Sequence, residues 1–468
     1  MRARELAVPT RMARVAIVAG EEHLRAALAT AADSGCLELA GSVPAPEGEA
    51  LEALRRLERL PSPNGRTVPR LARRERVVTE LERRGRRDLL AGEVELSRRV
   101  RAALRHGRYA AVVGWIPEMD VEGMRSRLAE AGAALVELPR PRWVEPPTLL
   151  ADSSGVSRFR ALVDSYGSVR YADVDPTPFA VVAFVVMFGM MFGDVGHGLV
   201  LATLGLWLRR TRSSILGSYR ELWPFPVAAG LTAALFGFLY GEAFGPTGLV
   251  PTLWLSPMEE PITLLAAAIG VGAALLAASY TLGTVNRWRE GGPLSALLAP
   301  SGIAGILVFL GVGLAVTGWY VGWPAVAIGG SGSATAGVAL LAAGFKLEAG
   351  RGAAAVTQAT VEVVDAVVRV VANVISFARL AAFGLMHAAL ATIVFEAATA
   401  LWGTPAASAL AVLVFVAGNV LTFALEALVA GVQALRLEYY ELFSRIFAGE
   451  GHRFAPWHIP FDTAEEEP

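Results

Sequence analysis

Long apolar runs, separated by short polar segments, occupy the C-terminal two thirds of the chain. From about Pro176 to Arg445 charged residues are sparse, and the runs reach roughly 20 residues, the length that an α-helix needs to cross a bilayer. Up to about Leu150 the chain is instead rich in Arg and Glu. This contrast predicts two domains that fold in different solvents, the first in water and the second in a membrane.

The N-terminal part has the pattern of a small α/β domain. Residues 13–41 have the pattern of an apolar strand, an amphipathic helix and a second strand, and residues 109–138 repeat that plan. Between them, residues 70–105 are rich in Arg and Glu with Leu and Val at helical spacing, which predicts an exposed helical hairpin or coiled coil. The Pro-rich stretch Pro139 to Thr148 predicts a hinge toward the membrane.

The apolar runs predict eight membrane spans. They lie at about 177–191, 195–208, 223–241, 261–284, 299–320, 324–345, 362–402 and 406–446. The first two are short enough to form one helix if merged, but eight spans place the basic loop residues on a single side. The basic residues of those loops include Arg209, Arg210, Arg220, Arg287, Arg289 and Lys346. The opposite loops contain acids such as Glu259 and Glu260, so both termini are predicted to be cytoplasmic.

The expected fold is an α-helical polytopic membrane protein with a small N-terminal α/β cytoplasmic domain that carries a short helical arm. The last two spans, at about 40 residues each, approach 60 Å, twice the hydrocarbon thickness, so they tilt strongly or project from the bilayer. The expected parts are a cytoplasmic α/β domain at 1–150, a linker at 151–176, a membrane domain at 177–446 and a cytoplasmic tail at 447–468. No apolar run precedes the α/β domain, so we expect no cleavable signal peptide.

Composition narrows the function. Cys36 is the only cysteine, which excludes an intrachain disulfide and a thiol metal site. Lys346 is the only lysine, and no GxxxxGK[ST] loop contains it, so a Walker-type nucleotide hydrolase is excluded. The net charge of −1 conceals an Arg excess in the N-terminal domain. That excess would suit an acidic partner or lipid head groups, or is a solvated helical surface.

Arg379 lies near the middle of a predicted span, in VVRVVANVISFARLAAFGLMHAAL. A charge at that depth costs about 2.5–3.5 kcal/mol on insertion scales, so the residue needs a partner or a water-filled cavity. Arginine rather than lysine suits a fixed charge that attracts a carboxylate and never releases its own proton. The alternative is an arginine that only ties helices together.

The final span has a polar stripe. Asn419, Glu426 and Gln433 recur every seven residues, with Arg436 and Tyr440 close to the same face. A stripe of this kind is typical of a helix that lines a hydrated path. Hydrogen bonding between helices for packing is the alternative interpretation.

If the last two spans form an antiparallel hairpin about Gly403 and Thr404, their polar groups fall in a definite order. Glu426 then lies near the depth of Arg379, with His387 toward the outer side. Arg436 lies toward the cytoplasm by the same count. This order predicts an aqueous access channel between Arg379 and the outer surface.

A second polar group lies in MFGMMFGDVGHG, where Asp194 and His197 fall at the outer turn of the first two spans among glycines. The pair resembles part of a metal site, but two ligands without a third do not make one, and packing at a tight turn is the alternative. Glu242, in LFGFLYGEAFG, is equally ambiguous. We therefore expect no metal and no cofactor.

Motifs along the membrane part occur together in one known family. They are GWIP at 114–117, PPT at 146–148, DPTPF at 175–179, MMFGDVGHG at 190–198, LFGFLYG at 235–241, NRWREG at 286–291, ISFARLAAFGLMHAAL at 375–390 and ALRLEYYELFSRIF at 434–447. In order and content they resemble subunit I of archaeal and bacterial V/A-type ATPases, the counterpart of the eukaryotic vacuolar subunit a. The resemblance covers nearly the whole membrane part.

The resemblance implies a static cell-membrane subunit whose two long tilted helices face a rotating proteolipid ring. In that family two offset half-channels carry protons to and from the ring. By motif, the translocation residues are Arg379, Arg436, Glu426 and His387. Further lining residues by the same interpretation are Ser376, Asn419, Gln433, Glu438, Asp194 and His197. The implied partners are the proteolipid ring, the peripheral stalks, membrane lipid and, indirectly, the central stalk and the ATPase headpiece, with no nucleic acid.

The chain also departs from the family pattern. SFARL stands in place of the usual S-Y-L-R-L, so Phe377 and Ala378 lack a hydroxyl and bulk beside the arginine, and Glu438 stands where a histidine is common. The soluble domain is far shorter than is usual. A secondary transporter is the main alternative function, but it predicts an internal repeat that the sequence lacks. A non-conducting scaffold is the other alternative, and it would be expected to lose the two arginines.

Overall fold

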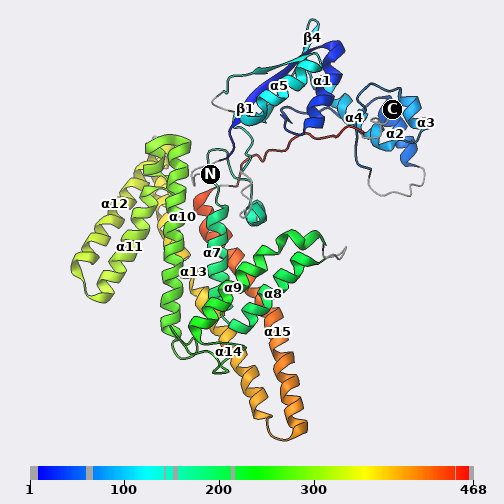
Figure 1. Cartoon of the computed structure of the whole chain (residues 1–468). Helices are drawn as coiled ribbons and strands as arrows, with labels where there is room; N and C mark the ends of the chain where they lie inside the picture. The colour runs from blue at the N-terminus through cyan, green and yellow to red at the C-terminus, as the bar shows by residue number, and fades with distance from the viewer. Residues whose placement is uncertain are drawn as a thin grey trace. The chain divides into compact units, whose positions relative to one another are not determined.

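The structure is a computed structural model of the whole chain, and it describes residues 9–59, 67–141, 144–150, 157–211, 217–350, 352–447 and 449–462. The chain divides into two compact units. The α/β unit consists of Pro9–Leu150 together with Gly451–Pro468, and the membrane unit contains Ala151–Glu450. Each unit is described by itself below (Figure 1).

The α/β unit is built on an antiparallel sheet with strand order β2-β4-β1-β5, and β3 also pairs with β4. Its elements are β1 (Met12–Gly20), α1 (Glu21–Ser34), β2 (Glu38–Leu39), β3 (Leu104–His106), β4 (Tyr109–Pro117), α5 (Val121–Glu130) and β5 (Ala133–Glu137). The two predicted strand–helix–strand segments are therefore present, with their first strands paired at the centre of the sheet. Gly114 permits the close approach of β2, because a Cβ there would lie 2.5 Å from the Glu38 carbonyl oxygen.

The charged stretch between the two strand–helix–strand segments forms short helices. They are α2 (Glu49–Glu58), α3 (Val78–Arg83) and α4 (Arg87–Ala102). Gly85, with φ of 68°, makes the turn between α3 and α4, where the sequence predicts a helical hairpin. Apolar residues of the three helices, including Leu57, Leu81 and Leu90, form a small shared core. The arm is thus a three-helix cluster with charged residues on its outer face.

The segment after the last membrane helix belongs to the α/β unit. The backbone N–H of Trp457 donates to the Leu37 carbonyl oxygen (2.9 Å), and that of Ile459 donates to the Ala32 oxygen (3.1 Å). Both side chains are buried in the core formed by the sheet and α1. Sequence analysis predicts only a cytoplasmic tail at 447–468, and this packing lacks a local signal because the segment forms no regular element.

The regular elements in the described part of the membrane unit are helices, joined by loops such as 241–260. Its elements are η2 (Ser157–Phe159), α6 (Arg160–Asp164), α7 (Thr177–Met191), α8 (Val195–Arg210), η3 (Gly217–Leu222), α9 (Pro224–Tyr240), α10 (Pro261–Leu298), α11 (Ile303–Val321), α12 (Pro324–Ala349), α13 (Ala353–Ser376), α14 (Ala378–Ala400), α15 (Pro405–Leu437), the π-helix η4 (Glu438–Phe443) and α16 (Ser444–Ile446). Proline begins several of these helices, where its missing N–H has no helical partner to lose.

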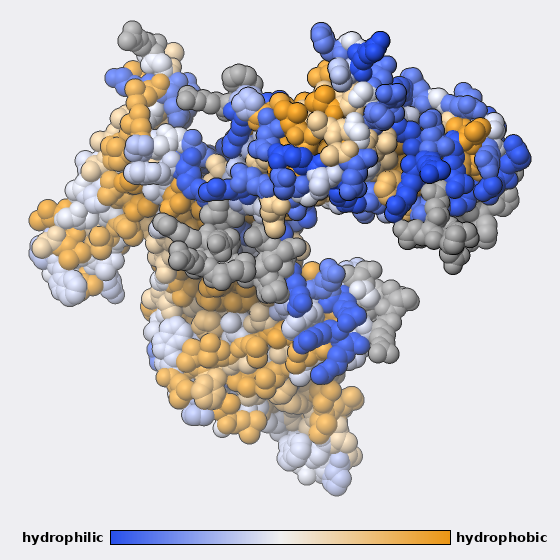
Figure 2. All heavy atoms as spheres, turned by 45° about the horizontal axis from the view of Figure 1, so that its top comes forward, coloured by the Kyte–Doolittle hydropathy of each residue, from blue (hydrophilic) through white to orange (hydrophobic). Residues whose placement is uncertain are grey.

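Within the described residues, six helical stretches are long and apolar enough to cross a membrane, so the chain is a multi-pass membrane protein. They are Tyr219–Tyr240, Pro261–Leu298, Ile303–Val321, Pro324–Ala349, Ala353–Ala400 and Pro405–Ile446. The final two have 48 and 42 residues, which confirms the predicted pair of long helices. The expected total of eight is not confirmed, because α7 and α8 have only 15 and 16 residues. Hydrophobic side chains cover much of the visible surface of these helices, and charged ones gather on the α/β unit (Figure 2).

Candidate functional site

The turn between α7 and α8 holds Asp194 in a fixed position. Its Oδ1 accepts the backbone N–H of His197 (2.8 Å) and so caps α8, while its Oδ2 accepts the N–H of Gly245 (3.0 Å). The N–H of Val195 donates to the Glu242 carbonyl oxygen (2.9 Å), which ties the turn to the loop after α9. The motif GDVGHG is therefore a helix start whose cap is fully buried.

Glycines bring α8 and α9 into backbone contact beside this turn. A Cβ on Gly198 would lie 2.4 Å from the backbone nitrogen of Ala234, and one on Gly237 would lie 2.3 Å from that of Val195. No larger residue fits at either position without moving backbone. This packing fixes the direction in which α8 presents His197.

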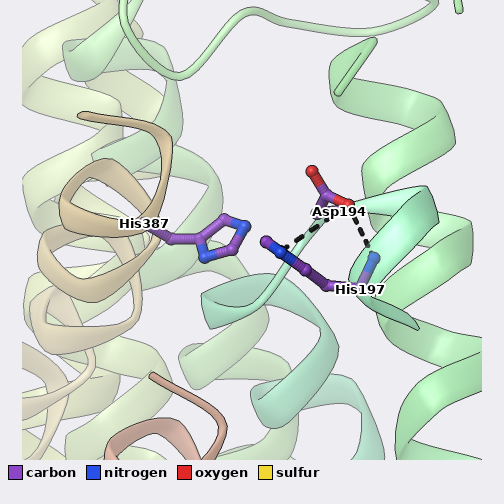
Figure 3. Close-up of side chains that lie close together, drawn as sticks. All are labelled: Asp194, His197 and His387. Atoms are coloured by element: carbon purple, nitrogen blue, oxygen red, sulfur yellow. Dashed lines mark hydrogen bonds and ion pairs between the residues drawn. The ribbon is translucent and has the colours of Figure 1, made fainter. Parts of the chain in front are cut away.

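Asp194, His197 and His387 form a compact buried cluster (Figure 3). Their exposed fractions are 0%, 1% and 2%, and one potential ligand atom from each lies within 4.8 Å of the others. The first two residues come from the α7–α8 turn and α8, whereas His387 comes from α14. His197 Nδ1 lies 3.8 Å from Asp194 Oδ1. The structure thus joins the turn motif to the long helices, which sequence spacing alone did not predict.

Glu426 of α15 extends the cluster by one residue. Its Oε2 contacts Nδ1 of His387, and its side chain is 6% exposed. Several atoms of the cluster have no hydrogen-bond partner among the described residues. They are His387 Nε2, both ring nitrogens of His197 and Glu426 Oε1. Asn419 lies beside the His197 ring but outside hydrogen-bonding geometry. These atoms are free to take a proton or a ligand.

Aromatic rings enclose the two histidines. Phe192 lies 5.0 Å from the His387 ring, between centroids, and Phe244 lies 5.3 Å from the His197 ring. Phe423 lies 5.9 Å from His197 on a further side. Phe244 is held with φ of 53°, which is unusual for a residue with a side chain. A shell of this kind lowers the local dielectric constant and strengthens every charge interaction inside it.

Two of the hollows along α15 border polar residues of the site. The first, of about 240 Å³, is lined by His197, Phe244, Asn419 and Phe423, among others, so it reaches the histidine cluster. The second, of about 470 Å³, is lined by Arg436, Tyr440 and Glu441 with neighbouring apolar residues. They lie at different levels of the same helix, separated by the segment that contains Glu426.

Arg379 lies just after the junction of α13 and α14, in a half-buried position. Its Nη1 has no hydrogen-bond partner among the described residues. Arg436 and Glu441 are close enough to interact with it electrostatically. Phe377, at the junction itself, is fully buried against Gly272 of α10, where a Cβ would lie 2.2 Å from the ring. This aromatic departure from the family pattern is therefore a packing residue.

The register of the hairpin differs from the one predicted by a turn at Gly403 and Thr404. Glu426 lies level with His387, which is eight residues after Arg379, or about 12 Å along a helix. Gly418 also lies close to Val394, in nearly the same register. The connection itself is short, since α14 ends at Ala400 and α15 begins at Pro405. Helix α15 is therefore displaced along α14 relative to the predicted register, which brings Arg379 toward the level of Arg436.

The remaining predicted site residues lie outside the cluster. The hydroxyl of Ser376 donates to the carbonyl oxygen of Ala372 (3.0 Å), within its own helix. Gln433 is half-buried and its Oε1 has no hydrogen-bond partner among the described residues. Glu438 is fully buried in η4, and neither of its carboxylate oxygens has a hydrogen-bond partner in the described part of the chain.

Sequence analysis did not select two acidic residues that the structure brings to the site. Glu242 is 7% exposed and interacts electrostatically with His387. The sequence feature that could have identified it is a lone acidic residue in a Gly-rich apolar motif, like that of Asp194. Glu441 lines the second hollow and interacts with Arg379. Its signal was weaker, because it lies at the end of a span where charged residues are common.

Comparisons with known proteins show which chains this one is similar to. The V-type ATPase 116kDa subunit family matches residues 103–261. A-type ATP synthase subunit I of Pyrococcus horikoshii is 27% identical over 88% of this chain and 66% of its own length. The protein of that name from Archaeoglobus fulgidus is 28% identical over 74% of this chain and 58% of its own length. V-type proton ATPase 116 kDa subunit a 3 of Homo sapiens is 33% identical over 28% of this chain and 17% of its own length. The chain thus spans less than two thirds of the length of these relatives.

Proposed function

Because this chain is a homologue of subunit I of A-type ATP synthases and of the V-type ATPase 116 kDa subunits, we propose that it is the static ion-conducting membrane subunit of a rotary ATPase or ATP synthase. In this function it couples proton flow to rotation of a proteolipid ring. The observation that carries the proposal is the row of polar groups along α15, from the buried Asn419 and Glu426 to the exposed Arg436, with His387 and Arg379 close to it.

The two hollows on α15 support two separate aqueous half-channels. One reaches His197 and Asn419, and the other reaches Arg436 and Glu441. Between them the row continues through Glu426 and Gln433, both with an oxygen that lacks a hydrogen-bond partner among the described residues. In a subunit that conducts protons, such oxygens exchange protons with water on either side. Because the two hollows lie at different levels and are separate, a proton must leave the first hollow before it can enter the second.

Arg379 is the fixed charge of the proposed path. Its guanidinium keeps its proton under all physiological conditions, so it attracts a carboxylate without carrying the proton onward. A free Nη1 and a half-buried position suit a temporary partner from another chain. In the proposed complex that partner is a carboxylate of the ring. Arg436, the second translocation arginine, keeps the second hollow positively charged.

An apolar face on the two long helices supports the ring as the neighbour. Exposed aliphatic side chains run along it, including Val364, Val368 and Ile375 of α13 and Val420, Leu421 and Leu428 of α15. Lipid covers such a face equally well, so the face alone does not select the partner. The selection comes from Arg379, since a lipid tail offers no carboxylate to an unpaired guanidinium nitrogen.

The domain plan and the topology also remain proposals. We propose the α/β domain at 1–150 as the cytoplasmic part that meets peripheral stalks, the linker at 151–176, the channel domain at 177–446 and a cytoplasmic C-terminal segment at 447–468. Lys346 in the last turn of α12 and Arg209 and Arg210 in that of α8 suit cytoplasmic ends of these helices.

Substitution of Arg379 by Ala in the assembled complex tests the proposal. The complex is reconstituted into vesicles, and ATP-driven acidification is measured beside ATP hydrolysis. We expect acidification to fall below detection while the complex still assembles. Arg379→Lys is expected to restore little, since a lysine gives up its proton in a desolvated site.

Arg369→Ala is the matched control. This arginine lies ten residues earlier on α13, is well exposed and pairs only with Asp365 on the same helix (2.7 Å). It is expected to pump normally. Unchanged acidification in Arg379→Ala would make Arg379 structural and refute the proposal. A wild-type complex that assembles and hydrolyses ATP but pumps nothing would instead indicate a non-conducting scaffold.

A further inference from the structure

We propose that Asp194, His197 and His387 bind a divalent transition-metal ion of the zinc type, with Glu426 holding His387 in place. The inference goes beyond the proposed function and does not depend on it, because metal binding is measurable without ion transport. Sequence analysis expected no metal because Asp194 and His197 lacked a third ligand. His387, nearly two hundred residues later, provides it.

The three ligand atoms are arranged as a zinc site requires. Two imidazole nitrogens and a carboxylate oxygen are a donor set that suits Zn²⁺ and not Mg²⁺ or Ca²⁺, which prefer oxygen ligands alone. At metal–ligand distances of about 2.0–2.1 Å, tetrahedral ligands lie roughly 3.3 Å apart. The observed atoms lie within 4.8 Å of one another, so movements of the ligand atoms by up to about 1.5 Å bring them to that spacing. Three protein ligands leave a fourth position for water.

His387 has its ligand nitrogen already oriented. Nδ1 contacts the Glu426 carboxylate, and Nε2 has no hydrogen-bond partner among the described residues. A histidine that ligates a metal through one nitrogen usually donates the other N–H to a carboxylate, which fixes the tautomer and the ring orientation. Glu426 is therefore a positioning residue for the metal, and its second oxygen is left unpartnered for the same reason.

His197 supplies the second independent indication. Its ring is 1% exposed, yet neither nitrogen forms a hydrogen bond within the described residues. An imidazole buried without a partner costs free energy. His387 and His197 face each other across the cluster, with ring centroids 5.6 Å apart (Figure 3). A shared metal ion would give both rings a partner at once.

The charge balance of the cluster also favours a cation. Asp194, Glu426 and Glu242 are all buried. Within the described residues, Asp194 and Glu426 form ion pairs with histidine, and none of the three acids pairs with an arginine or a lysine. Buried carboxylates need compensation by a positive charge or a metal. A divalent ion supplies two charges at a place where neutral histidines supply none.

An access route to the site exists. The hollow of about 240 Å³ on α15 is lined by His197, so it opens onto the cluster from that side. Asn419 lies in the same wall and offers an amide oxygen beside the cluster. Phe192 lies against His387, which slows the escape of a bound ion.

The test measures Zn²⁺ retained by the full-length chain, purified in detergent with an affinity tag that contains no histidine. The protein is stripped with a chelator, loaded with Zn²⁺ and desalted, and metal is determined by mass spectrometry. We expect one tightly held equivalent per chain. Co²⁺ loaded in the same way should give the strong visible absorption of a four-coordinate site with nitrogen ligands.

His197→Gln is the main variant, because its ring makes no hydrogen bond that the fold would lose. It is expected to lose the tightly held equivalent and the Co²⁺ absorption. His197→Phe keeps an aromatic ring among Phe192, Phe244 and Phe423 and serves if the first variant misfolds. Glu426→Gln is expected to bind about 10- to 100-fold more weakly, as a lost positioning residue does. Asp194 is left unchanged because it caps α8.

His106→Gln is the matched control, since this histidine lies exposed on β3. It should bind as the wild type does. Retention of the full equivalent by His197→Gln, or its loss in His106→Gln instead, would assign the metal to a surface site and overturn the proposal. A wild-type chain that retains no Zn²⁺ at all overturns it too.

Discussion

Carboxylates of the two units have different kinds of partner. In the α/β unit Asp462, only 3% exposed, meets the guanidinium groups of Arg70 and Arg86, and Arg86 also reaches Asp88 at 2.8 Å. In the membrane unit the buried acids Asp194 and Glu426 meet histidines. A guanidinium neutralises an acid permanently, whereas an imidazole does so only when protonated. The same residue type is therefore structural in one unit and suited to exchange protons or bind a cation in the other.

Asp173 shares features with the carboxylates of both units, because it is a buried acid with arginines nearby that do not fully neutralise it. It precedes α7, outside the membrane spans, and is 1% exposed. Burial, together with repulsion from the neighbouring Glu290, raises the pKa of Asp173 to about 7 despite the attraction of Arg287 and Arg170. Both of these arginines are already engaged with Glu290, Arg287 at 2.7 Å and Arg170 at 3.5 Å. The carboxyl of Asp173 is thus short of positive charge although arginines are near.

The largest predicted effect is a pH dependence of stability caused by Asp173. A rise of the pKa from 3.8 to about 7 means that the folded state holds a proton that the unfolded state has lost. The contribution of Asp173 to stability is therefore fully present below about pH 4 and is lost as the pH rises to about 7, by up to about 4 kcal/mol. Denaturant unfolding in detergent across this range measures the slope. Asp173→Asn should remove most of this pH dependence. An unchanged slope would contradict the prediction, because it would show that ionisation of Asp173 does not destabilise the folded state.

The second prediction concerns the arginine of the α/β unit. Arg86→Met removes the Arg86 guanidinium from the buried Asp462 and should lower the free energy of unfolding by about 2–3 kcal/mol. Arg84→Met is the matched control two residues away. Its pair with Glu80 is 60% and 41% exposed, so we expect less than about 0.5 kcal/mol. Equal losses in the two variants would remove the distinction between buried and exposed pairs.

A smaller effect of opposite sign is expected at Asp88. The Arg86 guanidinium lowers the pKa of this carboxyl below its usual value of 3.8. The pair thus contributes stability that is present above pH 4 and is lost as the pH falls through the lowered pKa. Hydrogen exchange of α4 amides in wild type and Asp88→Asn, corrected for intrinsic rates, measures it. The two variants should converge in acid, and a difference that grows in acid would contradict the prediction.

The smallest effect is expected for Glu438→Gln. Neither oxygen of this fully buried carboxyl has a hydrogen-bond partner in the described part of the chain, so the substitution breaks no contact of that kind. We expect stability to stay the same or to rise by less than about 1 kcal/mol, because a neutral amide is cheaper to bury than a carboxylate. Thermal unfolding of the two proteins compares them. A loss above 2 kcal/mol would reveal a partner for Glu438.

Much of the fold followed from the sequence because its signals were local. The strand–helix–strand segments of the α/β unit and the two long final helices depend on hydrophobic period and length, which each segment carries by itself. The number of spans was harder. α7 and α8 are apolar but short, and length alone does not tell whether a 15-residue helix crosses the bilayer.

The site was predicted only in part because it depends on distant contacts. The stripe of Asn419, Glu426 and Gln433 was visible as a seven-residue repeat. The contact of Asp194 and His197 with His387 was not, because no periodicity links α8 to α14. The level of Glu426 beside His387 depended on how far α15 is displaced along α14, which the sequence pattern does not measure. Without the contact to His387, the sequence offered only two candidate ligands for a metal.

The return of the chain to the α/β unit fixes the order in which the protein is completed during synthesis. Trp457 and Ile459 complete a core whose other members precede residue 136, and the residues Ala151–Glu450 are made in between. At about 5–20 residues per second, the ribosome needs roughly 15–60 s for that stretch. During this time part of the apolar surface of α1 and the sheet remains uncovered. A finished α/β core therefore identifies a chain whose membrane helices have already been made.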